Sequence, residues 1–170
     1  MLPVEQIASR LDDIFRLLTG GSRTALPRHQ TLQALIDWSY DLLTEPEKAL
    51  FRRLAVFSRS WTLEACETIC AGDDVESSEI LELLGHLIEK SLALKRSKVE
   101  GRALRYRLLD TIRQYAMTKL IESGEADIIR RRHAEYYFSL AEVGAPRALN
   151  DYTQKSWLEN MEIEVNNIRA

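Results

Sequence analysis

The chain has 170 residues, of which 45% are hydrophobic and 29% are charged, a composition typical of globular domains. Its net charge of −3 provides no global positive field that would attract nucleic acid. No apolar run approaches the ~20 residues that a membrane span needs, and the amino terminus lacks the basic start of a signal peptide. Two cysteines one helical turn apart indicate no disulfide framework, so we expect a cytoplasmic protein with no membrane partner.

The first two predicted elements are helices joined by an extended linker. Residues 4–18 place five apolar side chains on one stripe, and a pair of glycines then ends the helix. Pro27 disfavours helical backbone at the residue before it, so we expect residues 22–30 to form an extended linker. Residues 31–43 carry too many apolar side chains for one narrow stripe, which predicts a deeply packed second helix.

Three further helices are predicted next, the first with a clear start signal. Thr44 and Glu47 have the spacing of a capping box, which predicts a helix over residues 46–57. The side chains expected to be buried there are Leu50, Phe51, Leu54 and Phe57. Residues 60–70 predict a short extended piece that leads into a helix, and residues 74–91 predict another helix with apolar side chains every three or four positions.

The periodicity then changes from helical to alternating. Residues 92–109 indicate two strands joined by a polar turn at Gly101, and Asp110 opens a helix that Gly124 ends. Helices, a β-hairpin and a closing helix are the order of a winged helix. The sequence therefore predicts a mainly α fold with a winged-helix domain at residues 27–122, followed by two more helices.

Three stretches of the chain together resemble one protein family. They are the run from LPVEQIASRLDDIF to CETICAGD (2–73), YRLLDTIRQYAMTKLIESGEADIIRRRHAEYYFSLAE (106–142) and WLENMEIEVNNIRA (157–170). In this order they resemble the region that follows the nucleotide-binding domain in bacterial transcriptional regulators of the STAND class, whose ATPase core is related to NB-ARC. The resemblance implies an ATPase-lid helix and linker at 1–26, a regulatory winged helix at 27–122 and the first helices of tetratricopeptide-like repeats at 123–170.

The resemblance also implies a function in signal transduction without catalysis. The chain contains no G-x-x-x-x-G-K-[ST] motif, so we expect no ATP hydrolysis, no catalytic residues and no cofactor in this chain. ATP and ADP are implied only for the full-length family, whose ATPase core lies upstream. The implied partners are that upstream nucleotide-binding domain and the downstream helical repeats, and the implied role is to couple nucleotide state to the sensor repeats.

Members of the NB-ARC group carry a Met-His-Asp triplet where the last strand meets the final helix, and its histidine contacts the ADP phosphates. The matching residues here are Leu108, Leu109 and Asp110. Leu109 cannot donate a hydrogen bond to phosphate, so we favour a helix-capping role for Asp110 over nucleotide sensing. In the linker, Arg28 and His29 match a region that passes near the nucleotide in the family.

Direct DNA binding is the alternative function for a winged helix. The helix before the wing is acidic, because Glu76, Glu79, Glu82 and Glu89 face a single Lys90, and DNA phosphates would repel it. The wing is basic instead. Its possible phosphate contacts are Lys95, Arg96, Lys98, Arg102, Arg105 and Arg107. A solvated hairpin, or a surface that docks on acidic neighbouring domains, explains the same charges.

Other chemistry-bearing residues have simpler explanations. Cys66 and Cys70 lack further ligands at zinc spacing, so we expect buried side chains and no metal site. The basic run at 130–133 precedes Tyr136 and Tyr137, a pattern open to base stacking, but a solvated face beside a packed aromatic stripe is favoured.

Overall fold

The computed structural model describes residues 27–72, 74–96, 103–144 and 161–169. The predicted helix over 4–18, the wing turn at Gly101 and the first part of the last predicted helix lie outside these residues. The chain divides into two compact units, Met1–Leu42 and Leu43–Ala170.

In the first unit, helix α2 spans Pro27–Asp41. It begins four residues earlier than the sequence predicted, so the expectation of an extended linker through residue 30 was wrong. Proline suits the first turn of a helix, because its fixed φ is helical and the missing N–H would have no intrahelical partner. Arg28 and His29 therefore lie in the first helical turn.

The second unit opens with helix α3, Glu45–Arg53, which continues into a 3₁₀ turn, Leu54–Val56. The predicted capping box is confirmed. The Thr44 hydroxyl accepts a hydrogen bond from the Glu47 amide at 3.4 Å, and the Glu47 carboxylate accepts one from the Thr44 amide at 2.8 Å. The four apolar residues expected to be buried, Leu50, Phe51, Leu54 and Phe57, are fully inaccessible to solvent.

Strand β1 (Ser60–Thr62), helix α4 (Leu63–Cys70), a 3₁₀ turn (Ser77–Glu79) and helix α5 (Ile80–Glu89) follow. The Thr62 hydroxyl caps α4 by accepting a hydrogen bond from the Ala65 amide at 3.2 Å. Helix α5 buries one apolar stripe against the unit. That stripe consists of Ile80, Leu83, Leu84 and Leu87.

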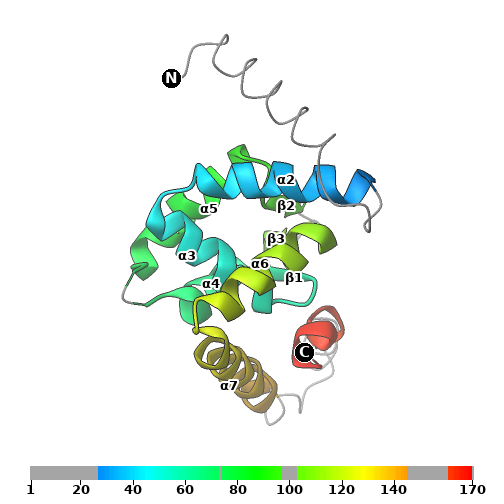
Figure 1. Cartoon of the computed structure of the whole chain (residues 1–170). Helices are drawn as coiled ribbons and strands as arrows, with labels where there is room; N and C mark the ends of the chain where they lie inside the picture. Colours follow the sequence, from blue (N-terminus) through cyan, green and yellow to red (C-terminus); the bar gives the residue numbers. More distant parts are fainter. Residues whose placement is uncertain (1–26, 73, 97–102, 145–160, 170) are drawn as a thin grey trace. The chain divides into compact units, whose positions relative to one another are not determined.

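The sheet has three short antiparallel strands in the order β1-β3-β2, with β2 at Leu94–Arg96 and β3 at Arg105–Arg107 (Figure 1). Trp61 pairs with Tyr106, and both are buried, so this face of the sheet contacts the core. Because side chains alternate along a strand, Arg105 and Arg107 lie on the opposite face. The predicted hairpin is thereby confirmed, and the order of helices and strands is that of a winged helix.

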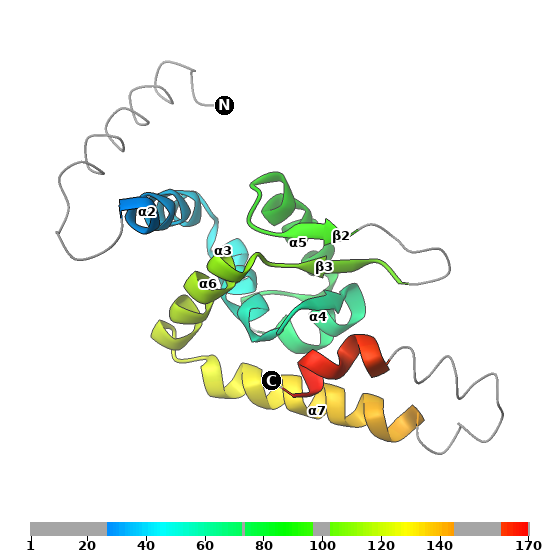
Figure 2. The same cartoon turned by 90° about the vertical axis from the view of Figure 1, so that its right-hand side faces the viewer.

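Helices α6 (Asp110–Glu122) and α7 (Ala126–Gly144) complete the unit, together with a helical segment at residues 161–168. The turn between α6 and α7 passes through Gly124, whose φ of 77° favours glycine over residues with a side chain. Figure 2 shows the C-terminal segment beside α7, and Asn167 and Ile168 line a groove together with α7 side chains.

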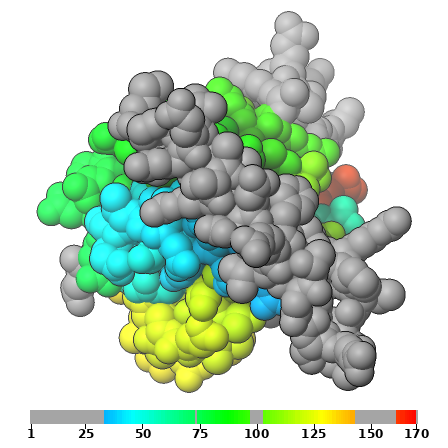
Figure 3. All heavy atoms as spheres, turned by 45° about the horizontal axis from the view of Figure 1, so that its top comes forward, coloured from blue at the N-terminus to red at the C-terminus, as the bar shows by residue number. Residues whose placement is uncertain are grey.

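A cluster of charged side chains joins α3 to the α6–α7 turn. Arg53, only 4% exposed, donates hydrogen bonds to the Cys70 carbonyl at 3.0 Å and to the Glu125 carboxylate. Arg52 donates to the other Glu125 oxygen at 2.5 Å, and Asp74 lies 3.5 Å from Arg53. Figure 3 shows α3 (cyan) and the start of α7 (yellow) adjoining on one face. Burial raises the pKa of Glu125, but the two arginines outweigh it and lower that pKa to about 2.

We expect Glu125→Gln to destabilise the unit by about 3 kcal/mol, because it leaves the buried Arg53 guanidinium without its main counter-charge. Chemical denaturation at neutral pH measures this change. Asp127→Asn is the matched control. Asp127 is two residues away from Glu125 and almost fully exposed, and its ion pair with the exposed Arg130 is long, at 3.8 Å. Equal effects of the two substitutions would contradict the role assigned to Glu125.

An aromatic cluster fills the space between β1 and α7. Phe57 stacks on Trp61 with ring centroids 5.0 Å apart and contacts His133 at 5.6 Å, and His133 lies 4.7 Å from Tyr137. His133 is 4% exposed, and its Nε2 atom has no hydrogen-bond partner in the described part of the chain. Burial lowers the pKa of His133 to about 4, although the nearby Glu164 carboxylate acts in the opposite direction.

This pKa predicts an acid-sensitive unit. His133 in the unfolded chain titrates near pH 6.5, so the unfolded state binds the extra proton first, and stability is lost as the pH falls from about 6.5 towards 4. The loss attributable to His133 is at most about 3 kcal/mol. Denaturant titrations at pH 7, 6, 5 and 4.5 measure it. His133→Phe should flatten the slope across this window, and an unchanged slope would contradict the assignment.

Candidate macromolecular interface of the winged helix

Helix α5 occupies the position that enters the major groove in DNA-binding winged helices. The exposed side chains of α5 itself are Leu81, Glu82 and Glu89, and Glu76 and Glu79 are exposed just before it. Its two basic groups turn inward. Lys90 Nζ lies 2.7 and 2.8 Å from the Glu47 carboxylate oxygens, and His86 Nδ1 lies 3.1 Å from the same group.

The inward contacts of α5 belong to the same capping box that begins α3. Glu47 is 2% exposed. Burial raises the pKa of Glu47, but the hydrogen bonds from Lys90 and from the Thr44 amide outweigh burial and lower it. The acidic character of the α5 surface predicted from the sequence is therefore confirmed, and Lys90 does not offset it.

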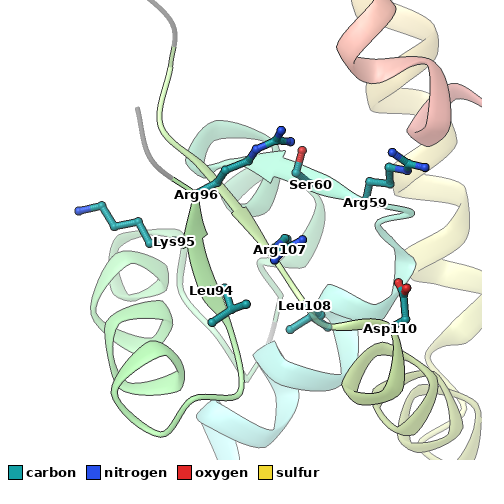
Figure 4. A pocket seen from close by; sticks show the side chains of 8 residues that line it. All are labelled: Arg59, Ser60, Leu94, Lys95, Arg96, Arg107, Leu108 and Asp110. Atoms are coloured by element: carbon teal, nitrogen blue, oxygen red, sulfur yellow. The ribbon is translucent and has the colours of Figure 1, made fainter. Parts of the chain in front are cut away.

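A second surface lies on the face of the sheet that is turned away from the core. Here a pocket of about 580 Å³ opens between the strands and the start of α6 (Figure 4). We call it the basic groove. Its cations are Arg59, Lys95, Arg96 and Arg107, and its other lining residues are Ser60, Leu94, Leu108 and Asp110. In Figure 4 the Lys95 side chain points away to one side, whereas Arg107 lies at the centre.

The cations of the basic groove are unpaired within the part of the chain that the structure describes. Several arginines elsewhere in the unit have partners: Arg52 and Arg53 bind Glu125, and Arg132 donates to the Ala71 carbonyl. By contrast, Arg59, Lys95, Arg96 and Arg107 form no ion pair with any described residue, although all four line one pocket that also contains the Asp110 carboxylate. The groove therefore presents positive charge available to an anionic partner.

The structure separates the six basic residues of the predicted wing. Lys95, Arg96 and Arg107 line the basic groove, while Lys98 and Arg102 lie outside the described residues. Arg105 is occupied within the unit. Its guanidinium donates to the Ser60 hydroxyl and carbonyl at 2.9 and 2.8 Å and to the Glu164 carboxylate at 2.5 Å.

Arg59 is a residue of the groove that the sequence pattern does not reveal. This residue lies in the short run Ser58–Ser60, far from the hairpin in sequence, and only the pairing of β1 with β3 brings it beside Arg107. An isolated arginine between two serines carries no periodic signal. Knowledge of the strand order β1-β3-β2 would have been needed to place it.

The three residues that align with the Met-His-Asp triplet of NB-ARC proteins, residues 108–110, lie at the edge of the basic groove. Leu108 is buried, Leu109 is 43% exposed, and Asp110 is exposed. Helix α6 begins at Asp110 with Leu109 as the N-cap residue, so the expectation that Asp110 caps this helix with its side chain is not met. Asp110 is the first helical residue. A carboxylate there is attracted by the helix dipole, an interaction weaker than a capping hydrogen bond. Arg28 and His29 belong to the other unit.

Cys66 and Cys70 are both fully buried in α4, as expected from their spacing. Burial and the neighbouring Cys70 raise the pKa of the Cys66 thiol, with the hydrogen bond to Cys70 the larger cause. Among the residues described, no group of three or more metal-ligating side chains comes together. Within the same residues, no helix combines the length and apolar character that crossing a membrane requires.

The fold and these surfaces define the class of the unit: residues 43–121 match the family model of a winged helix-turn-helix domain. The match covers α3 to α6, that is, both the acidic α5 surface and the basic groove. No solved structure matches the chain.

The whole chain is also similar to proteins named as putative HTH-type transcriptional regulators. It is 47% identical over all 170 residues to the "Putative HTH-type transcriptional regulator Rv0890c" of Mycobacterium tuberculosis and to its Mycobacterium bovis counterpart. A further Mycobacterium tuberculosis protein, the "Uncharacterized protein Rv0894", is 42% identical over 135 residues, which are 79% of this chain and 34% of that protein. The chain spans 19% of the length of the first two relatives.

The two helix starts predict different costs of substitution. Thr44→Ala removes a side-chain cap and should destabilise the unit by about 1 kcal/mol. Asp110→Ala removes only a favourable charge in the first turn and should cost about 0.5 kcal/mol or less, an effect that added salt reduces. Urea denaturation of both variants measures the difference. A larger cost for Asp110→Ala would contradict its placement as the first helical residue.

Proposed function

We propose that this chain is a non-catalytic regulatory module of a larger HTH-type transcriptional regulator, and that its winged helix contacts protein domains instead of recognising base sequence. The observation that carries the proposal is the surface of α5. Base edges in the major groove are usually contacted by Arg, Lys, Asn or Gln, and the exposed side chains of α5 are glutamates and a leucine.

The resemblance to STAND regulators supplies the context of this proposal. In that layout a nucleotide-binding domain precedes the winged helix and helical repeats follow it, and ATP or ADP binds in the preceding domain only. The first relatives are about five times longer than this chain, which leaves room for such domains. Leu108, Leu109 and Asp110 supply no phosphate donor, so nucleotide state would be transmitted by domain contact and not by a hydrogen bond from the triplet.

Binding of DNA through the basic groove is the second candidate function. It rests on the unpaired Arg59, Lys95, Arg96 and Arg107, because phosphate contacts from arginine and lysine give affinity without sequence specificity. The winged helix-turn-helix match is also compatible with DNA binding.

We expect the purified chain to show no saturable binding to labelled duplex DNA, measured by fluorescence anisotropy at low and at moderate salt. Saturable binding that weakens steeply with salt would overturn the proposal in favour of DNA binding. In that case Arg96→Glu/Arg107→Glu should abolish it, whereas Arg131→Glu, an exposed arginine on α7 outside the groove, should have little effect.

The complementary measurement is a calorimetric titration with the region that precedes the winged helix in the full-length regulator. The proposed function predicts binding that a charge change on α5 (Glu82→Lys/Glu89→Lys) or in the groove (Arg96→Glu/Arg107→Glu) weakens at least severalfold. Undiminished binding by both double variants would exclude these two surfaces as the contact.

A further inference from the structure

The C-terminal helical segment at residues 161–168 is held against β1 by an unusual set of polar contacts. Asn167, 2% exposed, accepts a hydrogen bond from the Ser58 amide at 2.9 Å and donates to the Ser60 carbonyl at 2.9 Å. The two ends of one side-chain amide therefore satisfy a backbone donor and a backbone acceptor at the start of β1. Since β1 lies at the edge of the sheet, these backbone groups have no neighbouring strand on that side.

Glu164 completes the contact one helical turn earlier. Its carboxylate accepts from Arg105 on one oxygen and from the Asn167 amide at 2.8 Å on the other. Glu164 and Asn167 are three residues apart, so they lie on the same face of the segment. Arg105 in turn donates to the Ser60 hydroxyl and carbonyl. One face of the segment carries the pattern Glu-x-x-Asn. Its two polar side chains form hydrogen bonds with a small surface that consists of Ser58, Ser60 and Arg105.

The other side of the segment is loosely packed. A groove of about 480 Å³ lies between the segment and α7, lined by Asn167 and Ile168 of the segment and by α7 side chains that include Phe138 and Ala141. Phe138 and Ile168 are 65% and 45% exposed. The segment is therefore held by polar contacts beside a groove that it does not fill, and its backbone partners at the sheet edge could bind water if the segment left. Both features favour reversible attachment over permanent incorporation into the core.

We propose that Ser58, Ser60 and Arg105 form a docking site for a helix with the pattern Glu-x-x-Asn, and that residues 161–168 are its detachable occupant. The winged helix then exists in an attached and a released form, and whatever acts on the chain after α7 shifts the balance between them. The inference is independent of whether the basic groove binds DNA or protein.

Amide hydrogen exchange of the full chain, resolved by NMR, tests the docking site, because the Ser58 amide is a direct reporter of Asn167. In the wild-type chain this amide should exchange more slowly than an unprotected amide but faster than that of the buried Ile69 in α4. Asn167→Ala and Glu164→Gln should each accelerate Ser58 exchange about tenfold and leave Ile69 unchanged. Glu162→Gln, a change of an exposed glutamate on the same segment, is the control and should have no effect.

Equal exchange of Ser58 and Ile69 in the wild-type chain, or a parallel acceleration of both in the variants, would overturn the proposal, because the segment would then be an integral part of the fold. Unchanged Ser58 exchange in the variants would overturn it as well. A peptide with the sequence of residues 159–170, in millimolar excess, should slow Ser58 exchange in the Asn167→Ala chain. The same peptide with alanine at the position of Asn167 should not, and equal effects of the two peptides would contradict recognition of the pattern.

Discussion

The buried guanidinium of Arg53 is the constraint on which the arrangement of this unit depends. A charge with 4% exposure is tolerated only when hydrogen bonds and opposite charges surround it. Here those partners come from three places in the sequence: the carbonyl that ends α4, Asp74 in the following loop and Glu125 at the start of α7. Satisfying one side chain thus brings the end of α4 and the α6–α7 turn to α3. Gly72 belongs to this arrangement, because a side chain there would approach Arg53 Nη1 to 3.3 Å.

The same principle explains which charges remain at the surface. The acids that face inward, Glu47, Glu125 and Glu164, each bind at least one basic side chain. These pairs occupy the charges of Lys90, Arg52, Arg53 and Arg105. The glutamates that point outward from α5 are therefore not offset by these cations. Among the described residues, Arg59, Lys95, Arg96 and Arg107 remain unpaired and line the basic groove. The acidic and basic surfaces of the domain therefore result from the internal pairing, and a net charge of −3 gives no indication of either.

Local features of the fold were predictable from the sequence, because short-range interactions determine them. The Thr44–Glu47 capping box, the apolar stripe of α5 and the alternating strands of the hairpin all depend on residues close in sequence. The first residue of α2 was mispredicted, since Pro27 is equally compatible with a linker and with a first helical turn. The role of Asp110 depended on a shift of one residue at a helix start, which sequence patterns do not resolve.

The candidate sites were less predictable, because non-local pairing creates them. Arg59 lines the basic groove because β1 pairs with β3. Arg105 does not line it, because its guanidinium binds Glu164 of the C-terminal segment. Ser60 lies at the meeting point of both surfaces. It lines the basic groove (Figure 4), and its carbonyl accepts hydrogen bonds from Asn167 and Arg105. The two surfaces therefore share one residue of the short edge strand β1, Ser60, which lines the groove and contacts the C-terminal segment.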